Sequence, residues 1–95
     1  MNFLLEYGIK KETIEKIKEI KDDSEVFYCL TQKDNVTKVI NYLQSINVKN
    51  IDDILLNRLE LFYVPVNKIK ESFEKYNINV LVQLLNEDIN ILNNV

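Results

Sequence analysis

The apolar positions of this chain recur with a period of thirty residues over its second and third parts. When residues 36–65 are shifted by thirty positions they fall on residues 66–95, and the same positions are apolar in both segments. In the first segment these are Val36, Val39, Leu43, Ile46, Val48, Ile51, Ile54, Leu55, Leu59, Leu61 and Phe62. In the second they are Val66, Ile69, Phe73, Tyr76, Ile78, Leu81, Leu84, Leu85, Ile89, Ile91 and Leu92. A fixed period of this length is typical of a helical repeat.

Each thirty-residue unit predicts two α-helices and a short 3₁₀ turn. In the second unit, apolar residues three and four apart predict helices over 36–46 and 51–58, while 59–62 is long enough only for a 3₁₀ turn. In the third unit the same pattern predicts a helix over 67–76, with Phe73 and Tyr76 inward.

The second helix of each unit has its own start signal. Asn50 is expected to cap the one in the second unit and Asn79 the one in the third, because Asn is a favoured N-cap residue. In the third unit this helix is expected to bury Leu81, Leu84 and Leu85, and a closing 3₁₀ turn follows over 88–92.

Residues 1–35 predict an irregular first unit. A strong amphipathic helix covers 11–21, with an apolar stripe that ends at Ile17 and Ile20. Residues 25–28 read Glu-Val-Phe-Tyr and resemble Glu-Leu-Phe-Tyr at 60–63, which predicts a second copy of the short tail.

Three residues that tolerate a left-handed backbone occupy one place in the alignment of the units. These are Gly8, Asn47 and Asn77, each followed by a β-branched residue. Gly and Asn adopt positive φ more readily than other residues and commonly end a helix in this way. We therefore expect a left-handed break at all three positions.

Together these patterns predict a single all-α domain over residues 1–95. It is a short array of helix-pair repeats, with units at 1–35, 36–65 and 66–95. An alternative is an irregular helical bundle in which the period is incidental.

This arrangement resembles the repeat of the mitochondrial transcription termination factor (mTERF) family. That repeat has about thirty residues, two α-helices and a short 3₁₀ helix. The matching breaks are Leu4–Ile9, Leu43–Val48 and Phe73–Ile78, and the matching tails are Leu59–Phe62 and Ile89–Leu92. The family usually has proline just before the tail, whereas the only proline here, Pro65, follows it. The resemblance implies nucleic-acid binding or a role near transcription.

The charge of the chain favours a different partner. The net charge is −3, with twelve basic and fifteen acidic residues, and no unit is basic. Proteins that hold duplex nucleic acid usually present a clustered positive surface. The charge therefore favours a protein partner or self-association, with no nucleic-acid binding, as the alternative to the function that the resemblance implies.

The candidate nucleic-acid contacts are lysines. Lys38 and Lys68 occupy the same repeat position, and Lys70 and Lys75 lie on the same predicted helix as Lys68. Stacked units would align Lys38 with Lys68 in a row that phosphates could contact. The alternative is a solvated face, since acidic residues interleave with the lysines of the third unit.

The candidate contacts for a protein partner or a second copy are apolar residues near the two ends of the sequence. Terminal units of an array normally carry a polar outer face, so apolar ends indicate an interaction site. The candidates are Phe3, Leu4, Ile89, Ile91, Leu92 and Val95. The alternative is that these residues fold back into the core.

No pattern predicts catalysis. The chain has no histidine, and Cys29, its only cysteine, lacks a base to activate it. One cysteine without histidine cannot build a zinc site, and no glycine-rich phosphate loop occurs. We therefore expect a non-catalytic module with no metal and no cofactor.

The sequence predicts a cytoplasmic protein. No apolar stretch approaches the length of a membrane span, and the first residues lack the cationic start of a signal peptide. An unpaired cysteine fits a reducing compartment.

Overall fold

The computed structural model describes all residues, 1–95, and confirms the prediction of an all-α fold. It contains six α-helices, three 3₁₀ helices and no strand. The α-helices are α1 (Lys11–Ile20), α2 (Asp23–Thr31), α3 (Lys33–Ser45), α4 (Ile51–Asn57), α5 (Val66–Glu74) and α6 (Ile78–Glu87). The 3₁₀ helices are η1 (Asn2–Tyr7), η2 (Leu59–Tyr63) and η3 (Ile89–Asn94).

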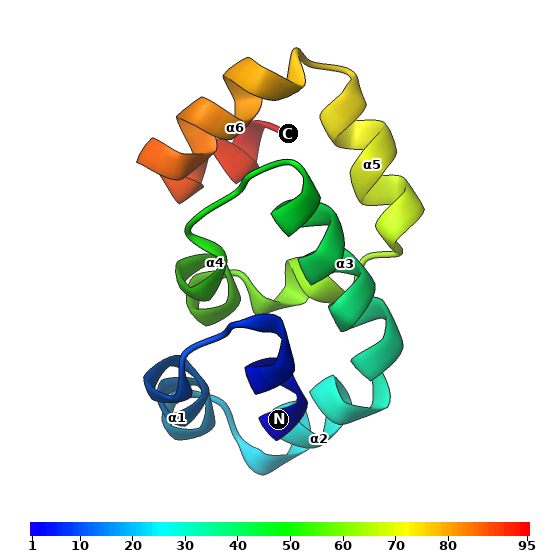
Figure 1. Cartoon of the computed structure of the whole chain (residues 1–95). Coiled ribbons are helices and arrows are strands. Elements are labelled where there is room, and N and C mark those ends of the chain that lie inside the picture. The colour runs from blue at the N-terminus through cyan, green and yellow to red at the C-terminus, as the bar shows by residue number, and fades with distance from the viewer.

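One order of elements, two α-helices and then a 3₁₀ helix, occurs twice in succession. It is formed first by α3, α4 and η2, and then by α5, α6 and η3. In Figure 1, α1, α4 and α6 follow one another along one side of the molecule, while α2, α3 and α5 follow one another along the other. A single cluster of buried apolar side chains extends from Met1 to Leu92. In Figure 1, α1 and α2 form one end of the molecule, and α5 and α6 form the other.

The first two breaks adopt the expected left-handed conformation. Gly8 has φ 83° and Asn47 has φ 71°. The N–H of Ile9 donates to the carbonyl of Leu4 at 3.3 Å, and the N–H of Val48 donates to that of Leu43 at 3.0 Å. Each of these hydrogen bonds joins a residue to the one five positions earlier, which is the bond that closes a helix ending in the left-handed conformation. The two breaks thus share both backbone conformation and hydrogen bonding.

The third break differs, and the prediction of a left-handed Asn77 is wrong. Asn77 has φ −67° and ψ 112°, and its side-chain oxygen accepts hydrogen bonds from the N–H groups of Asn79 and Val80. Because α6 already begins at Ile78, its first N–H groups need an acceptor, and Asn77 supplies it. The N-cap is therefore Asn77 and not Asn79.

Asn50 lies at the N-cap position of α4, as predicted, but its side chain makes no capping bond. Its Nδ2 instead donates to the carbonyl of Leu85 at 2.9 Å. This bond joins the second unit to the third.

Residues 25–28 form part of α2, so the predicted second copy of the short tail is wrong. Asp22 caps this nine-residue helix by accepting a hydrogen bond from the N–H of Glu25 at 2.9 Å. Acidic residues in the first turn, Asp23 and Glu25, also suit the helix dipole. This start signal outweighs the resemblance of residues 25–28 to 60–63.

Asn35 fixes the place where α5 begins. Its Nδ2 donates to the carbonyls of Phe62 at 2.9 Å and Val64 at 2.6 Å, and its Oδ1 accepts from the N–H of Val66 at 3.2 Å. One side chain of α3 thus holds the connection from η2 to α5. As a result α5 packs beside α3, and the two helices enclose a groove.

Candidate functional site

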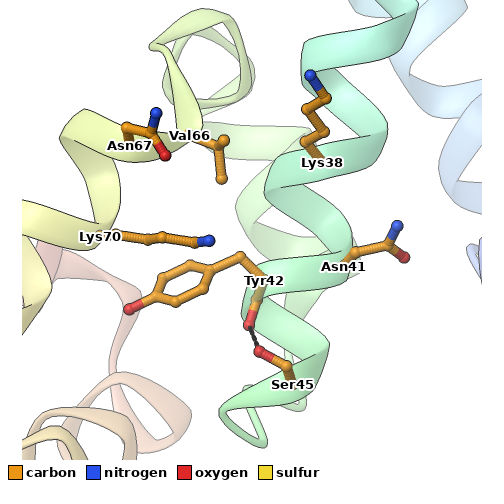
Figure 2. Close-up of a pocket in the computed structure, with 7 residues that line it drawn as sticks. All are labelled: Lys38, Asn41, Tyr42, Ser45, Val66, Asn67 and Lys70. Carbon is orange, nitrogen blue, oxygen red and sulfur yellow. Dashed lines mark hydrogen bonds between the residues drawn. The ribbon is translucent and has the colours of Figure 1, made fainter.

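The groove between α3 and α5 brings two of the predicted lysines together. It has a volume of about 500 Å³. Its lining residues are Lys38, Asn41, Tyr42, Ser45, Val66, Asn67 and Lys70. Figure 2 shows the Lys70 side chain reaching across the groove towards Tyr42, with Lys38 one turn away on α3. No acidic residue lines this groove, which makes it a local exception in an acidic chain.

Tyr42 is the aromatic centre of this groove. The Lys70 Nζ lies 5.5 Å from the centre of its ring, within the range of a cation–π interaction. The ring of Phe73 lies 6.0 Å away on the other helix. Partial burial, together with the nearby charge of Glu74, raises the pKa of the Tyr42 hydroxyl, which therefore stays protonated at neutral pH. The ring is thus held as a neutral surface beside a cation.

The structure does not form the expected row of Lys38 with Lys68. Lys68 lines a different groove of about 320 Å³ between α5 and the 3₁₀ helices η2 and η3. Lys75 follows the last turn of α5 and lines neither groove. The reason is geometric. The sides of α3 and α5 that face each other across the groove carry different positions of the thirty-residue repeat. Lys38 therefore shares a groove with Lys70 and not with Lys68, its equivalent in the repeat.

Two of the six predicted end residues are buried. Leu4 is completely buried and Leu92 nearly so, and both belong to the main core. The other four, Phe3, Ile89, Ile91 and Val95, are half-buried and pack against that core. The 3₁₀ helices η1 and η3 turn these residues inward, so Leu4 and Leu92 cannot serve as exposed contacts.

The exposed apolar side chains lie elsewhere. One group is on and just before α6, where Tyr76, Val80 and Leu84 are 47%, 53% and 42% exposed. Tyr76 and Leu84 were expected to point inward, and that prediction is wrong. With Asn77 and Leu81 they line a shallow groove of about 180 Å³. We call this group of three side chains the α6 face.

A second group lies at the opposite end of the molecule. It consists of Leu5, Ile20, Phe27, Tyr28 and Leu30. Phe27 on α2 is the most open of them, at 67%. Ile20 was placed in the buried stripe of α1, but it falls on the last residue of that helix and is exposed. These five residues belong to η1, α1 and α2, and the ring of Tyr28 also packs edge-on against that of Tyr63, with ring centroids 4.9 Å apart. We call them together the η1–α2 face.

Sequence reasoning missed both faces because it assigned one apolar stripe to each helix. In α6 a signal was present, since Val80 and Leu84 are four residues apart and lie outside the stripe formed by Leu81, Val82 and Leu85. A helix with a second apolar stripe needs a second partner or stays exposed on that side.

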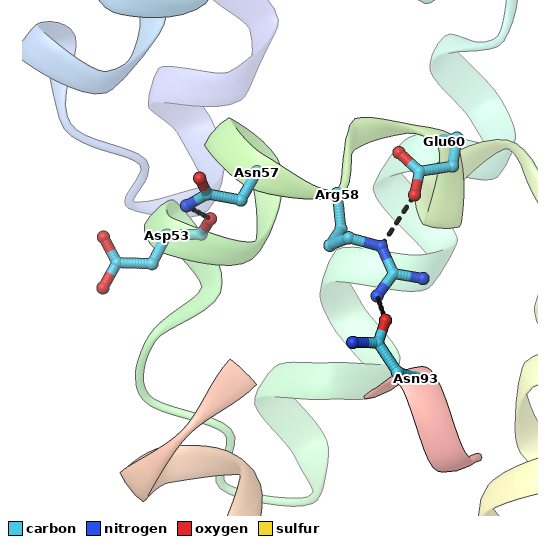
Figure 3. A network of polar contacts seen from close by, with 5 residues as sticks. All are labelled: Asp53, Asn57, Arg58, Glu60 and Asn93. Atoms are coloured by element: carbon cyan, nitrogen blue, oxygen red, sulfur yellow. Dashed lines mark hydrogen bonds and ion pairs between the residues drawn. The ribbon is translucent and has the colours of Figure 1, made fainter. Parts of the chain in front are cut away.

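The polar network around Arg58 has a structural role. Figure 3 shows its guanidinium between Glu60 and Asn93. Nε donates to Glu60 and Nη1 to Asn93, each at 2.7 Å. Burial opposes ionisation of Glu60, but the hydrogen bond and charge of Arg58 outweigh it and lower the pKa of that carboxyl. The network ties the end of α4 to η3.

The only cysteine of the chain lies in the core. Cys29 is completely buried, and burial raises the pKa of its thiol. A protonated buried thiol is a poor nucleophile. No group of three or more carboxylate, cysteine or histidine side chains comes close enough to hold a metal ion.

None of the helices combines the length and the apolar character needed to cross a membrane.

No protein-family model, no curated protein and no solved structure matches this chain.

Proposed function

We propose that this chain is a non-catalytic binding module built as a short array of helical repeats of the mTERF-like type, and that it binds protein through its two apolar faces. The observation that carries the proposal is the exposure of the α6 face and the η1–α2 face at opposite ends of the molecule. Clustered apolar side chains on a surface mark interaction sites, because covering them removes apolar area from water.

The repeat assignment is supported by the recurring order of elements and by the matching breaks at Gly8 and Asn47. An acidic chain without a continuous lysine row also favours protein over nucleic acid as the partner. A cytoplasmic location is part of the same proposal.

The experiment is site-specific photo-cross-linking in cells. A photoreactive phenylalanine analogue replaces Val80 in one variant and Phe27 in another, and the products are identified by mass spectrometry. We expect discrete protein adducts from both positions. The matched control places the analogue at Gln83, which is exposed on α6 but does not line the α6 face. Adducts of equal yield from Gln83, or none from Val80 and Phe27, would contradict the proposal.

Nucleic-acid binding is a second candidate, favoured by the groove between α3 and α5. Two lysines and a neutral aromatic ring without an acidic residue among them could contact phosphate and stack on a base. The test is fluorescence anisotropy of a labelled duplex and a labelled single strand at low and high salt. Binding that weakens steeply with salt and is lost in Lys38→Glu/Lys70→Glu supports this candidate, and no binding at low salt rejects it.

A further inference from the structure

The groove between α3 and α5 gathers donor side chains that have no acceptor within the chain. Lys38 lines it from α3, and Asn67 and Lys70 line it from α5. None of these three side chains forms a hydrogen bond or an ion pair, and the only hydrogen bond drawn in Figure 2 joins the hydroxyl of Ser45 to the carbonyl of Tyr42. Ammonium groups only donate hydrogen bonds, and the amide of Asn67 can donate beside them. The set therefore suits an anion.

The nearby carboxylates leave one end of the groove without negative charge. Glu74 acts on the hydroxyl of Tyr42, whose pKa it helps to raise, and it lies two turns after Asn67 on α5. In Figure 1, α3 and α5 run in the same direction, so Lys38, one turn before Tyr42, lies towards the start of α5 and away from Glu74. The other acidic residues of these two helices neither line the groove nor pair with its lysines; they are Asp34 and Glu71.

The positive charge of this groove is local. Lys68 lines a different groove, and Lys75 lines neither of the two. The chain as a whole has a net charge of −3. A polymer with many phosphates gains affinity from each cation that it meets, and here successive phosphates would meet none beyond the first pair of lysines. A single compact group contacts both Lys38 and Lys70 and extends no further into the negative field of the protein.

The size of the groove fits a small molecule. Its volume of about 500 Å³ lies within the range of small-molecule sites, about 300–1,000 Å³. Tyr42 and Val66 are its only apolar lining residues, and Lys70 lies between the ring of Tyr42 and the part of the groove that Asn67 lines (Figure 2). The groove thus offers a cationic part and a short apolar part side by side.

We propose that this groove binds a small phosphate monoester. The phosphate lies between Lys38 and Lys70 and accepts a further hydrogen bond from Asn67, and the organic group lies against Tyr42 and Val66. At neutral pH a phosphate monoester carries about two negative charges and three strong acceptor oxygens, whereas a carboxylate carries one charge. The inference goes beyond the proposed function, because none of these residues belongs to the α6 face or the η1–α2 face.

The test is an NMR titration of the isotope-labelled protein with phenyl phosphate, in a buffer that contains no phosphate. We expect saturable shifts of the backbone amides at Lys38, Tyr42, Asn67 and Lys70. Phenyl sulfate, which has nearly the same shape and only one negative charge, should bind clearly more weakly. In Lys38→Gln/Lys70→Gln the dissociation constant for phenyl phosphate should rise about tenfold, since two exposed ion pairs are lost.

The matched control is Lys68→Gln/Lys75→Gln. It removes the same two charges from exposed positions of the same region, outside the groove, and should bind phenyl phosphate as the wild type does. Circular dichroism checks that both double variants are folded. Shifts that do not saturate, equal affinity for phenyl sulfate, or an equal loss in the two double variants would each overturn the site.

A labelled single strand or duplex is titrated in parallel. An oligonucleotide that binds more tightly than phenyl phosphate and depends on Lys38 and Lys70 would overturn the small-molecule assignment and support the nucleic-acid candidate. None of these outcomes bears on cross-links from Val80 and Phe27, so the protein-binding proposal is tested separately.

Discussion

The carboxylate of Asp52 accepts a hydrogen bond from the backbone N–H of Lys10 at 2.9 Å, across 42 positions of the sequence. The same Oδ2 accepts from the hydroxyl of Thr13 at 2.8 Å. At the equivalent position after the second break, the N–H of Lys49 donates to Asn86. In both cases a side chain on the second helix of one unit accepts a hydrogen bond from a backbone N–H of the preceding unit. These bonds hold α4 beside the start of α1, and α6 beside the start of α4.

Replacement of Asp52 by alanine should destabilise the fold. The change leaves the N–H of Lys10 and the hydroxyl of Thr13 without their acceptor, and Thr13 is buried. We expect the free energy of unfolding to fall by about 1–3 kcal/mol, measured by urea denaturation. Asp53→Ala is the matched control, since it removes a carboxylate from the same helix turn that accepts no hydrogen bond. Equal losses in the two variants would show that the contact with Lys10 does not matter.

Gly8→Ala should weaken the first break through the backbone alone. An added Cβ would meet no atom within 4 Å, so the penalty comes from the positive φ of 83°. We expect a loss of about 1–2 kcal/mol in thermal or chemical unfolding. Asn47→Gly, at the other left-handed position, should be neutral or stabilising. An unchanged stability of Gly8→Ala would mean that this break is not left-handed in solution.

Leu4 and Leu84 should respond in opposite ways to truncation. Leu4→Ala removes a completely buried side chain and should cost about 2–5 kcal/mol of unfolding free energy. Leu84→Ala alters a side chain on the α6 face and should change it by no more than about 0.5 kcal/mol. Both variants are measured at low protein concentration, so that self-association does not contribute. A larger loss for Leu84 would contradict the packing described above.

Asp22 should link stability to acidic pH. The pKa of this carboxyl is lowered from its usual value, mainly by the hydrogen bond that it accepts from the N–H of Glu25 and then by the one from the hydroxyl of Ser24. Since the folded-state pKa is the lower one, the stabilisation is present above the unfolded-state pKa and is lost as the pH falls through the folded-state value.

The measurement for Asp22 is the unfolding free energy of wild type and Asp22→Asn between neutral pH and pH 2. The difference between the two proteins should be largest above pH 4 and should shrink below it. Asp23→Asn provides a control, because the side chain of Asp23 does not cap α2. A difference that grows towards low pH would contradict the assignment.

Element types followed from local patterns for most of the chain. The 3₁₀ helix η2 falls where the short apolar tail predicted it, because a segment of that length between Arg58 and Pro65 has no room for an α-helix. The left-handed breaks at Gly8 and Asn47 were also predictable, since few residues tolerate positive φ.

Local reasoning failed where two local signals competed. Asn77 could either end α5 in the left-handed conformation or cap α6. It caps α6 because that helix begins at Ile78, two residues before the start that a cap at Asn79 would give. The same competition explains residues 25–28, where the cap at Asp22 produced an α-helix in place of a tail.

The candidate sites depended on packing between units and could not be predicted in detail. Lys38 and Lys70 share a groove because α5 packs beside α3, and no sequence spacing states that these two positions meet. Leu4 and Leu92 are buried because η1 and η3 turn towards the core, although both were expected at exposed ends.

The helical class, the order of most elements and the two left-handed breaks could be predicted from the amino-acid sequence, because those features depend on residues close together in the chain. Which side of each helix is covered depends on packing between distant segments. Ile54 and Leu84 occupy the same position in the thirty-residue pattern, yet one is buried and the other is 42% exposed. The third unit is hydrogen-bonded through α6 to the segment from Asn47 to Asn50 just before α4, whereas no element of this chain packs in that way on the start of α6, where Val80 is 53% exposed.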